Sequence, residues 1–118
     1  MRATNLRHAQ CYLTQLPQLE VICEPGERGK LRSRLPAGRW LRRIIVHRGA
    51  LNYTVESVEI NGTDLLASSV PAAIFAADSV IGMLDALAFS GDAKLVLRVI
   101  NTSDATVTFA YTPYVQRG

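Results

Sequence analysis

The sequence lacks a hydrophobic run long enough to cross a membrane. Its longest weakly charged stretch, residues 67–90, is interrupted by Pro71, Asp78, Gly82 and Asp85. A membrane-spanning helix needs about 20 consecutive, mostly apolar residues. The sequence therefore predicts no membrane association through a spanning helix.

Cysteine and histidine are also scarce. The two cysteines, Cys11 and Cys23, are separated by eleven intervening residues, a spacing that matches no zinc site, and His8 and His47 do not complete one. The basic N-terminal segment lacks the apolar run of a signal peptide, so we expect no export and reduced thiols. We therefore expect no metal and no cofactor, while a disulfide between the two cysteines stays open.

What the sequence does contain is the composition of a folded protein. It has 118 residues, of which 48% are hydrophobic and 19% charged, with a net charge of +3. This composition excludes intrinsic disorder, and the length favours one domain. We expect a flexible N-terminal arm over residues 1–10, where no core pattern occurs, and a single domain over residues 11–118. Charge is uneven, with a balance of +7 over residues 1–50 and −4 over residues 51–118.

Alternation of apolar and polar residues predicts β-strands along most of the chain. The Asn61-Gly62 pair is typical of a type I′ turn and predicts a hairpin between 53–60 and 63–66. The turn residues at 101–104 predict a second hairpin between 95–100 and 105–111. The other predicted strands are 10–14, 19–23, 29–35 and 40–47.

Residues 71–89 are ambiguous. Pro71 is suited to open a short helical turn through Phe75, and Asp78 could cap a second turn. That second turn would carry Ile81, Leu84, Leu87 and Ala88. The fold class predicted is all-β: a single-domain β-sandwich, jelly-roll-like, with at most one or two short helical turns near residues 71–89.

No residue pattern identifies a catalytic site. A nucleophile, base and acid would come from Ser57 or Ser90, His47 and Glu56, but no G-x-S-x-G motif is present. A barrel enzyme of the cupin type would need metal-binding histidines that the sequence does not have. The sequence therefore predicts a protein that is not an enzyme.

The clearest local feature is a basic segment. Strand periodicity places Lys30, Arg32 and Arg34 on one face. Such a stripe is either an anion-binding surface, for nucleic acid or an acidic neighbour, or simply a solvated face. We expect it to contact an acidic partner, most simply Glu56, Glu59 or Asp64 of a second copy. The full predicted surface is Lys30, Arg32, Arg34, Arg39, Arg42 and Arg43.

Several segments also resemble a known group of proteins. A strand ending in V-x-N-T-S is followed by a last strand that reaches almost to the C-terminus. The segments concerned are 40–46, 55–66, 70–75, 95–103 and 107–110. In this the chain resembles the small single jelly-roll or β-sandwich virion proteins of bacteriophages, which serve as capsid, cement or decoration subunits.

The resemblance implies a non-enzymatic structural subunit of a phage-like virion, assembled in the host cytoplasm. Its partners would be other copies of itself, as a homo-oligomer, and other capsid proteins. Nucleic acid is a further expected partner through the Arg-rich segment. The alternative is a small β-sandwich module that binds carbohydrate or nucleic acid, through that segment or through exposed aromatic residues such as Tyr53, Tyr111 and Tyr114.

Overall fold

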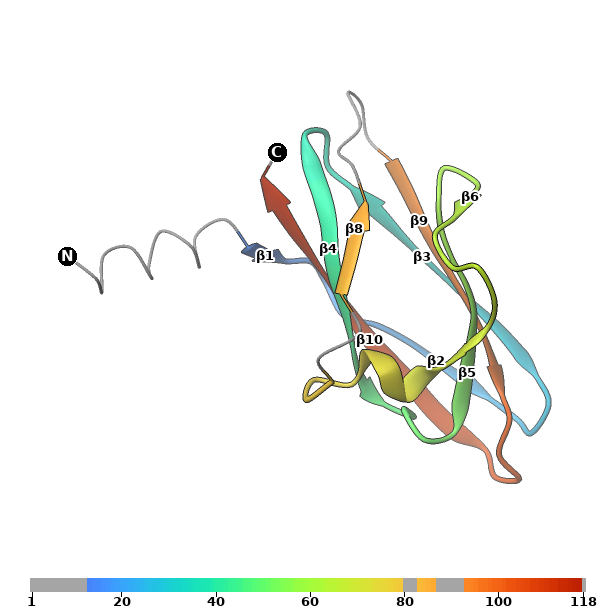
Figure 1. The fold of residues 1–118 in the computed structure, drawn as a ribbon. Coiled ribbons are helices and arrows are strands. Elements are labelled where there is room, and N and C mark those ends of the chain that lie inside the picture. Colours follow the sequence, from blue (N-terminus) through green and yellow to red (C-terminus); the bar gives the residue numbers. More distant parts are fainter. Residues whose placement is uncertain (1–12, 80–82, 87–92, 118) are drawn as a thin grey trace.

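The computed structural model describes residues 13–79, 83–86 and 93–117, and these form a β-sandwich of two antiparallel sheets (Figure 1). All the ladders between its strands are antiparallel. In chain order the elements are β1 (Leu13–Gln15), β2 (Leu19–Cys23), β3 (Arg28–Leu35), β4 (Arg39–Arg48), β5 (Tyr53–Ile60), β6 (Thr63–Asp64), β7 (Val70–Pro71), the 3-10 helix η1 (Ala72–Phe75), β8 (Met83–Ala86), β9 (Ala93–Asn101) and β10 (Val107–Arg117).

Each sheet is organised around one of the last two strands. In the first, called the β10 sheet, β10 lies between β4 and the successive strands β1 and β2, and β8 pairs with the other edge of β4. In the second, called the β9 sheet, β9 lies between β3 and β5, and β6 and β7 pair with the other edge of β5. Strand β3 is therefore an edge strand.

The pairing is nested from the ends of the chain toward its middle. Strands β1 and β2 pair with β10, β3 pairs with β9, β4 with β8, and β5 with β6 and β7. These nested pairs fall alternately in the β10 sheet and the β9 sheet. Each step from one nested pair to the next thus carries the chain from one layer to the other.

The core lies between the sheets, and the two-residue period of the strands builds it. In β9 every second residue from Ala93 to Asn101 is buried, and the residues between them are exposed or half-buried. A shift of one residue in register would turn this apolar row to solvent. Other strands contribute buried rows in the same way, including Leu31, Leu35, Leu41, Ile44, Val46, Val55, Val58, Ile60, Phe109, Tyr111 and Val115.

The all-β sandwich predicted from the sequence is confirmed. The β5–β6 hairpin has the predicted turn, because Asn61 and Gly62 take φ angles of 50° and 85° and Ile60 pairs with Thr63. The helical turn after Pro71 is present as η1. No helix among the described residues has the length and apolar character needed to cross a membrane.

The predicted hairpin between 95–100 and 105–111 is wrong. Strands β9 and β10 do not pair with each other; they belong to different sheets, and residues 102–106 connect the two layers. The physical reason is burial, because β9 and β10 each carry a full apolar row. Facing each other across the sandwich, the two rows cover one another.

The second helical turn is also wrong where the structure describes it. Residues 83–86 form β8, which pairs with β4 through Leu41 and Ala86 and through Arg43 and Met83. As a strand, this segment supplies hydrogen-bond partners to an edge of β4 that a helix would leave unpaired. Ile81, Leu87 and Ala88, the N-terminal arm and Cys11 lie outside the described residues, whereas Cys23 is a buried free thiol.

Candidate functional site

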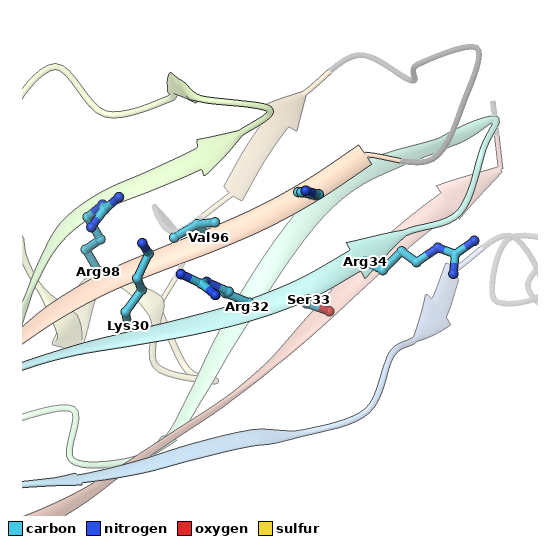
Figure 2. Close-up of a pocket in the computed structure, with 7 residues that line it drawn as sticks. Lys30, Arg32, Ser33, Arg34, Val96 and Arg98 are labelled. Carbon is cyan, nitrogen blue, oxygen red and sulfur yellow. The ribbon is translucent and has the colours of Figure 1, made fainter.

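The predicted basic stripe lies on the outer face of β3. Lys30, Arg32 and Arg34 are exposed, while Leu31 and Leu35 between and beyond them are buried in the core. Figure 2 shows the three cationic side chains along this strand. The alternation predicted from the sequence is confirmed.

The neighbouring strand β9 adds two cations to the same face. Its register places Lys30 opposite Arg98 and Arg34 opposite Lys94. Cross-strand neighbours of like charge repel one another and destabilise a sheet. Two such pairs therefore lie on this face of β3 and β9, with Arg32 and Val96 between them.

Side chains of β3 and β9 line an open groove with a volume of about 640 Å³. Figure 2 shows this groove in close-up. Five of the described lining residues are Lys or Arg, and Val96 supplies an apolar floor between them. We call this feature the cationic groove. Its lining residues are Lys30, Arg32, Ser33, Arg34, Lys94, Val96 and Arg98.

Strand β5 supplies carboxylates that pair with two cations of this face. Arg28 Nε donates to both oxygens of Glu56, at 3.1 and 3.2 Å, and Arg98 Nε donates to Glu59 Oε2 at 2.9 Å. Ser57 Oγ donates to the same Glu59 oxygen at 2.9 Å. The hydrogen bonds from Ser57 and then Arg98 lower the pKa of the Glu59 carboxyl.

These contacts bear on the partner predicted for the stripe. Glu56 and Glu59 were expected to meet it from a second copy, but both pair with arginines of their own sheet. Asp64 Oδ1 accepts hydrogen bonds from the backbone N–H groups of Val58 and Leu66, at 3.2 and 3.0 Å. These three acidic residues thus have partners within their own chain.

Three other cations of the groove are less engaged. Within the described part of the chain, Lys30, Arg32 and Lys94 make no side-chain hydrogen bond or ion pair. The backbone of Lys94 is fixed by Asn61, whose Oδ1 accepts its N–H at 2.8 Å and whose N–H donates to its carbonyl at 2.9 Å. The backbone is held in place while the ammonium group faces solvent.

The other three predicted anion-binding residues lie elsewhere. Arg39, Arg42 and Arg43 belong to β4, in the opposite sheet. Arg43 Nη2 donates to the carbonyl oxygens of Ala77 at 3.0 Å and Ser79 at 3.1 Å, and so holds the segment that follows η1. The structure therefore divides the six residues into two groups of three, on different sheets.

The candidate catalytic residues are not brought together. His47 lies in the β10 sheet, where its Nε2 is 2.7 Å from Thr112 Oγ1. Ser57 and Glu56 lie in the β9 sheet, where they contact Glu59 and Arg28. Ser90 lies outside the described residues.

The prediction that Tyr53 and Tyr111 are exposed is wrong. Tyr53 is 2% exposed, and its buried hydroxyl donates to Val107 O at 2.6 Å and accepts the Cys23 N–H at 3.1 Å. Burial is the main cause that raises the pKa of Tyr53 to about 12, and burial raises the pKa of Tyr111 too. Tyr114 is half-buried.

Sequence reasoning missed Lys94 and Arg98 as members of the site. They are more than 60 residues from Lys30 and Arg32 in the chain, and only the β3–β9 register brings them together. The signal available was their even spacing in an alternating strand.

Comparison of the chain with protein-family models, with curated proteins and with solved structures gives no match.

Proposed function

We propose that the chain is a non-enzymatic jelly-roll subunit of a phage-like virion, in a minor capsid, cement or decoration role. The observation that carries this proposal is the nested pairing of the strands. A jelly roll forms when a long antiparallel hairpin is rolled so that its successive strand pairs enter two sheets alternately. The order β1/β2 with β10, β3 with β9, β4 with β8 and β5 with β6/β7 supports such a fold.

The jelly roll is used by viral capsid proteins, by lectins and by cupins, so the fold alone leaves several functions open. The resemblance to phage virion proteins supports the first of these. The segments that carry it fall in structural strands: 40–46 in β4, 95–101 in β9 and 107–110 in β10. They include the central strand of each sheet.

The alternative of a carbohydrate-binding module is less supported by this structure. Glycan-binding faces use exposed aromatic rings, and Tyr53 and Tyr111 are buried in the core. The nucleic-acid alternative keeps its support from the cationic groove, and it is compatible with a virion role.

The experiment that tests the proposal has two parts. Light scattering after size-exclusion chromatography measures the mass of the purified chain at high micromolar concentration, where a homo-oligomer is expected. Antibody detection in particles purified on density gradients from induced cultures of the source organism measures incorporation, and a positive signal is expected. A strict monomer that is absent from the particles would overturn the proposal.

A further inference from the structure

The cationic groove is a charged surface whose ligand the proposed function leaves open. We propose that it binds the phosphate backbone of nucleic acid without reading base sequence. The groove combines cations from two adjacent strands, with Lys30 and Arg32 on β3 and Lys94 and Arg98 on β9. This assignment stands independently of any role in a virion.

The spacing of the cations suits a linear polyanion. Residues two apart on one strand are about 6.6 Å apart, and adjacent strands are about 4.8 Å apart, so the groove presents two parallel rows of positive charge. Lys30 and Arg98 are directly opposed and carry like charges, which repel each other, and Glu59 offsets only part of that repulsion. A chain of phosphates lying along the strands would relieve that repulsion by neutralising both rows.

The chemistry of the lining favours nucleic acid over a protein partner. Protein interfaces have an apolar or aromatic centre and contain little lysine. Here Val96 is the apolar lining residue that the structure describes, between Lys30, Lys94 and two flanking arginines. Interfaces with DNA are much more positively charged than those with protein. None of the described lining residues is aromatic, so the groove offers no ring on which a base could stack. We therefore expect it to contact the phosphates.

Protection of a sheet edge accounts for only part of this charge. Charged side chains on an edge strand discourage pairing with other chains, and β3 is such an edge. Strand β9 is flanked by β3 and β5, so it has no edge to protect. Edge protection therefore does not explain Lys94 on β9, whose ammonium group has no ion-pair partner in the described part of the chain.

Fluorescence anisotropy of a labelled random-sequence duplex of about 20 base pairs, titrated with the full chain over roughly 0.05–0.3 M salt, tests the proposal. The groove variant is Arg32→Gln/Lys94→Gln. The matched control is Arg39→Gln/Arg48→Gln, which removes the same charge from β4 in the opposite sheet. Circular dichroism melting confirms that both variants fold.

We expect the groove variant to reduce the salt slope by about 1.8, or about 0.9 for each phosphate that the protein no longer neutralises. At 0.1 M salt this corresponds to a loss of affinity of up to about 60-fold, whereas the control should change much less. A second random duplex should bind within about twofold of the first, because phosphates carry no sequence information.

Three results would overturn the proposal. One is no binding of the duplex by the unmodified chain at the lowest salt. Another is an equal loss of affinity in the groove variant and the control, which would assign binding to net charge alone. The third is a poly-glutamate peptide of matched charge that binds as tightly as the duplex, which would assign the groove to an acidic protein instead. Oligomeric mass is measured separately, so failure here does not bear on the proposed assembly role.

Discussion

Replacement of Asn101 by alanine should be among the most damaging polar substitutions in this protein. Asn101 is fully buried at the end of β9, where the chain leaves the β9 sheet for β10. Its Nδ2 donates to the carbonyls of Cys23 at 2.9 Å and Ala105 at 2.8 Å. Its Oδ1 accepts from the N–H and the hydroxyl of Ser103, at 2.9 and 2.7 Å. One side chain thus joins β2 to the crossing between the layers.

The magnitude follows from these four hydrogen bonds. Each contributes about 1 kcal/mol net, and a backbone group left buried without a partner costs about 1–3 kcal/mol. Because the Cys23 carbonyl loses a buried donor, Asn101→Ala should lower the free energy of unfolding by about 3–4 kcal/mol. That is a large share of the roughly 5–15 kcal/mol available to a domain of ordinary stability.

Urea denaturation followed by far-ultraviolet circular dichroism measures this loss. Thr102→Ala is the matched control, because Thr102 is exposed in the same loop and its hydroxyl makes only a 3.3 Å contact with Asn52 O. The control should lose no more than about 0.5 kcal/mol. A loss below about 1 kcal/mol for Asn101→Ala, with an unchanged denaturant slope, would refute the argument that this side chain holds the crossing together.

Three further predictions concern single positions. Tyr53→Phe should cost about 1–3 kcal/mol in urea unfolding, because a buried N–H and a carbonyl lose their partner. Since the pKa of Tyr53 is raised to about 12, above its ordinary value of 10.0, stability should fall as pH rises from 10 toward 12. The part of the phenolate absorbance that is missing in Tyr53→Phe should appear in this pH range only on unfolding. Gly49→Ala should destabilise the fold more than Gly26→Ala in thermal melts, because both have positive φ but only at Gly49 would a Cβ lie 2.7 Å from a backbone oxygen of β10. The pKa of the Glu59 carboxyl is lowered, mainly by the hydrogen bond from Ser57. The stabilisation from the charged carboxylate is therefore fully present above pH 4.5, the ordinary pKa, and is lost as the pH falls below that value. Glu59→Gln should reduce this loss of stability in acid, measured by thermal melts across pH.

The strands were predictable from the sequence because their signal is local. An alternating row such as 93–101 identifies its own buried face without reference to any partner. The pairing was less predictable, because the turn residues at 101–104 are equally suited to a hairpin and to a crossing between sheets. The choice between a hairpin and a crossing depends on how the apolar rows of β9 and β10 cover one another. The hydrogen bonds from the buried Asn101 amide to the carbonyls of Cys23 and Ala105 can be recognised only once the positions of the two layers are known.

The candidate site was predictable only in its first strand. Periodicity gave the shared face of Lys30, Arg32 and Arg34, which is a local property. Closeness in sequence then suggested that the β4 arginines, from Arg39 to Arg43, extend the same surface. The chain instead turns between β3 and β4 into the opposite sheet, so sequence neighbours separate.

The uneven charge of the sequence also has a different meaning in the folded chain. A basic first half and an acidic second half suggested contacts between copies, but the β9 sheet sets β3, β9 and β5 side by side and so brings both halves onto one face. Toward one end of that face, the carboxylates of Glu56 and Glu59 form ion pairs with Arg28 and Arg98. Toward the other end, the residue of the β5–β6 turn that contacts Lys94 is the neutral Asn61. The positive field of the cationic groove is therefore strongest around Arg32 and Lys94. Glu59 already offsets the charge of Arg98. Removing the charges of Arg32 and Lys94 should therefore weaken phosphate binding more than removing any pair of charges that includes Arg98.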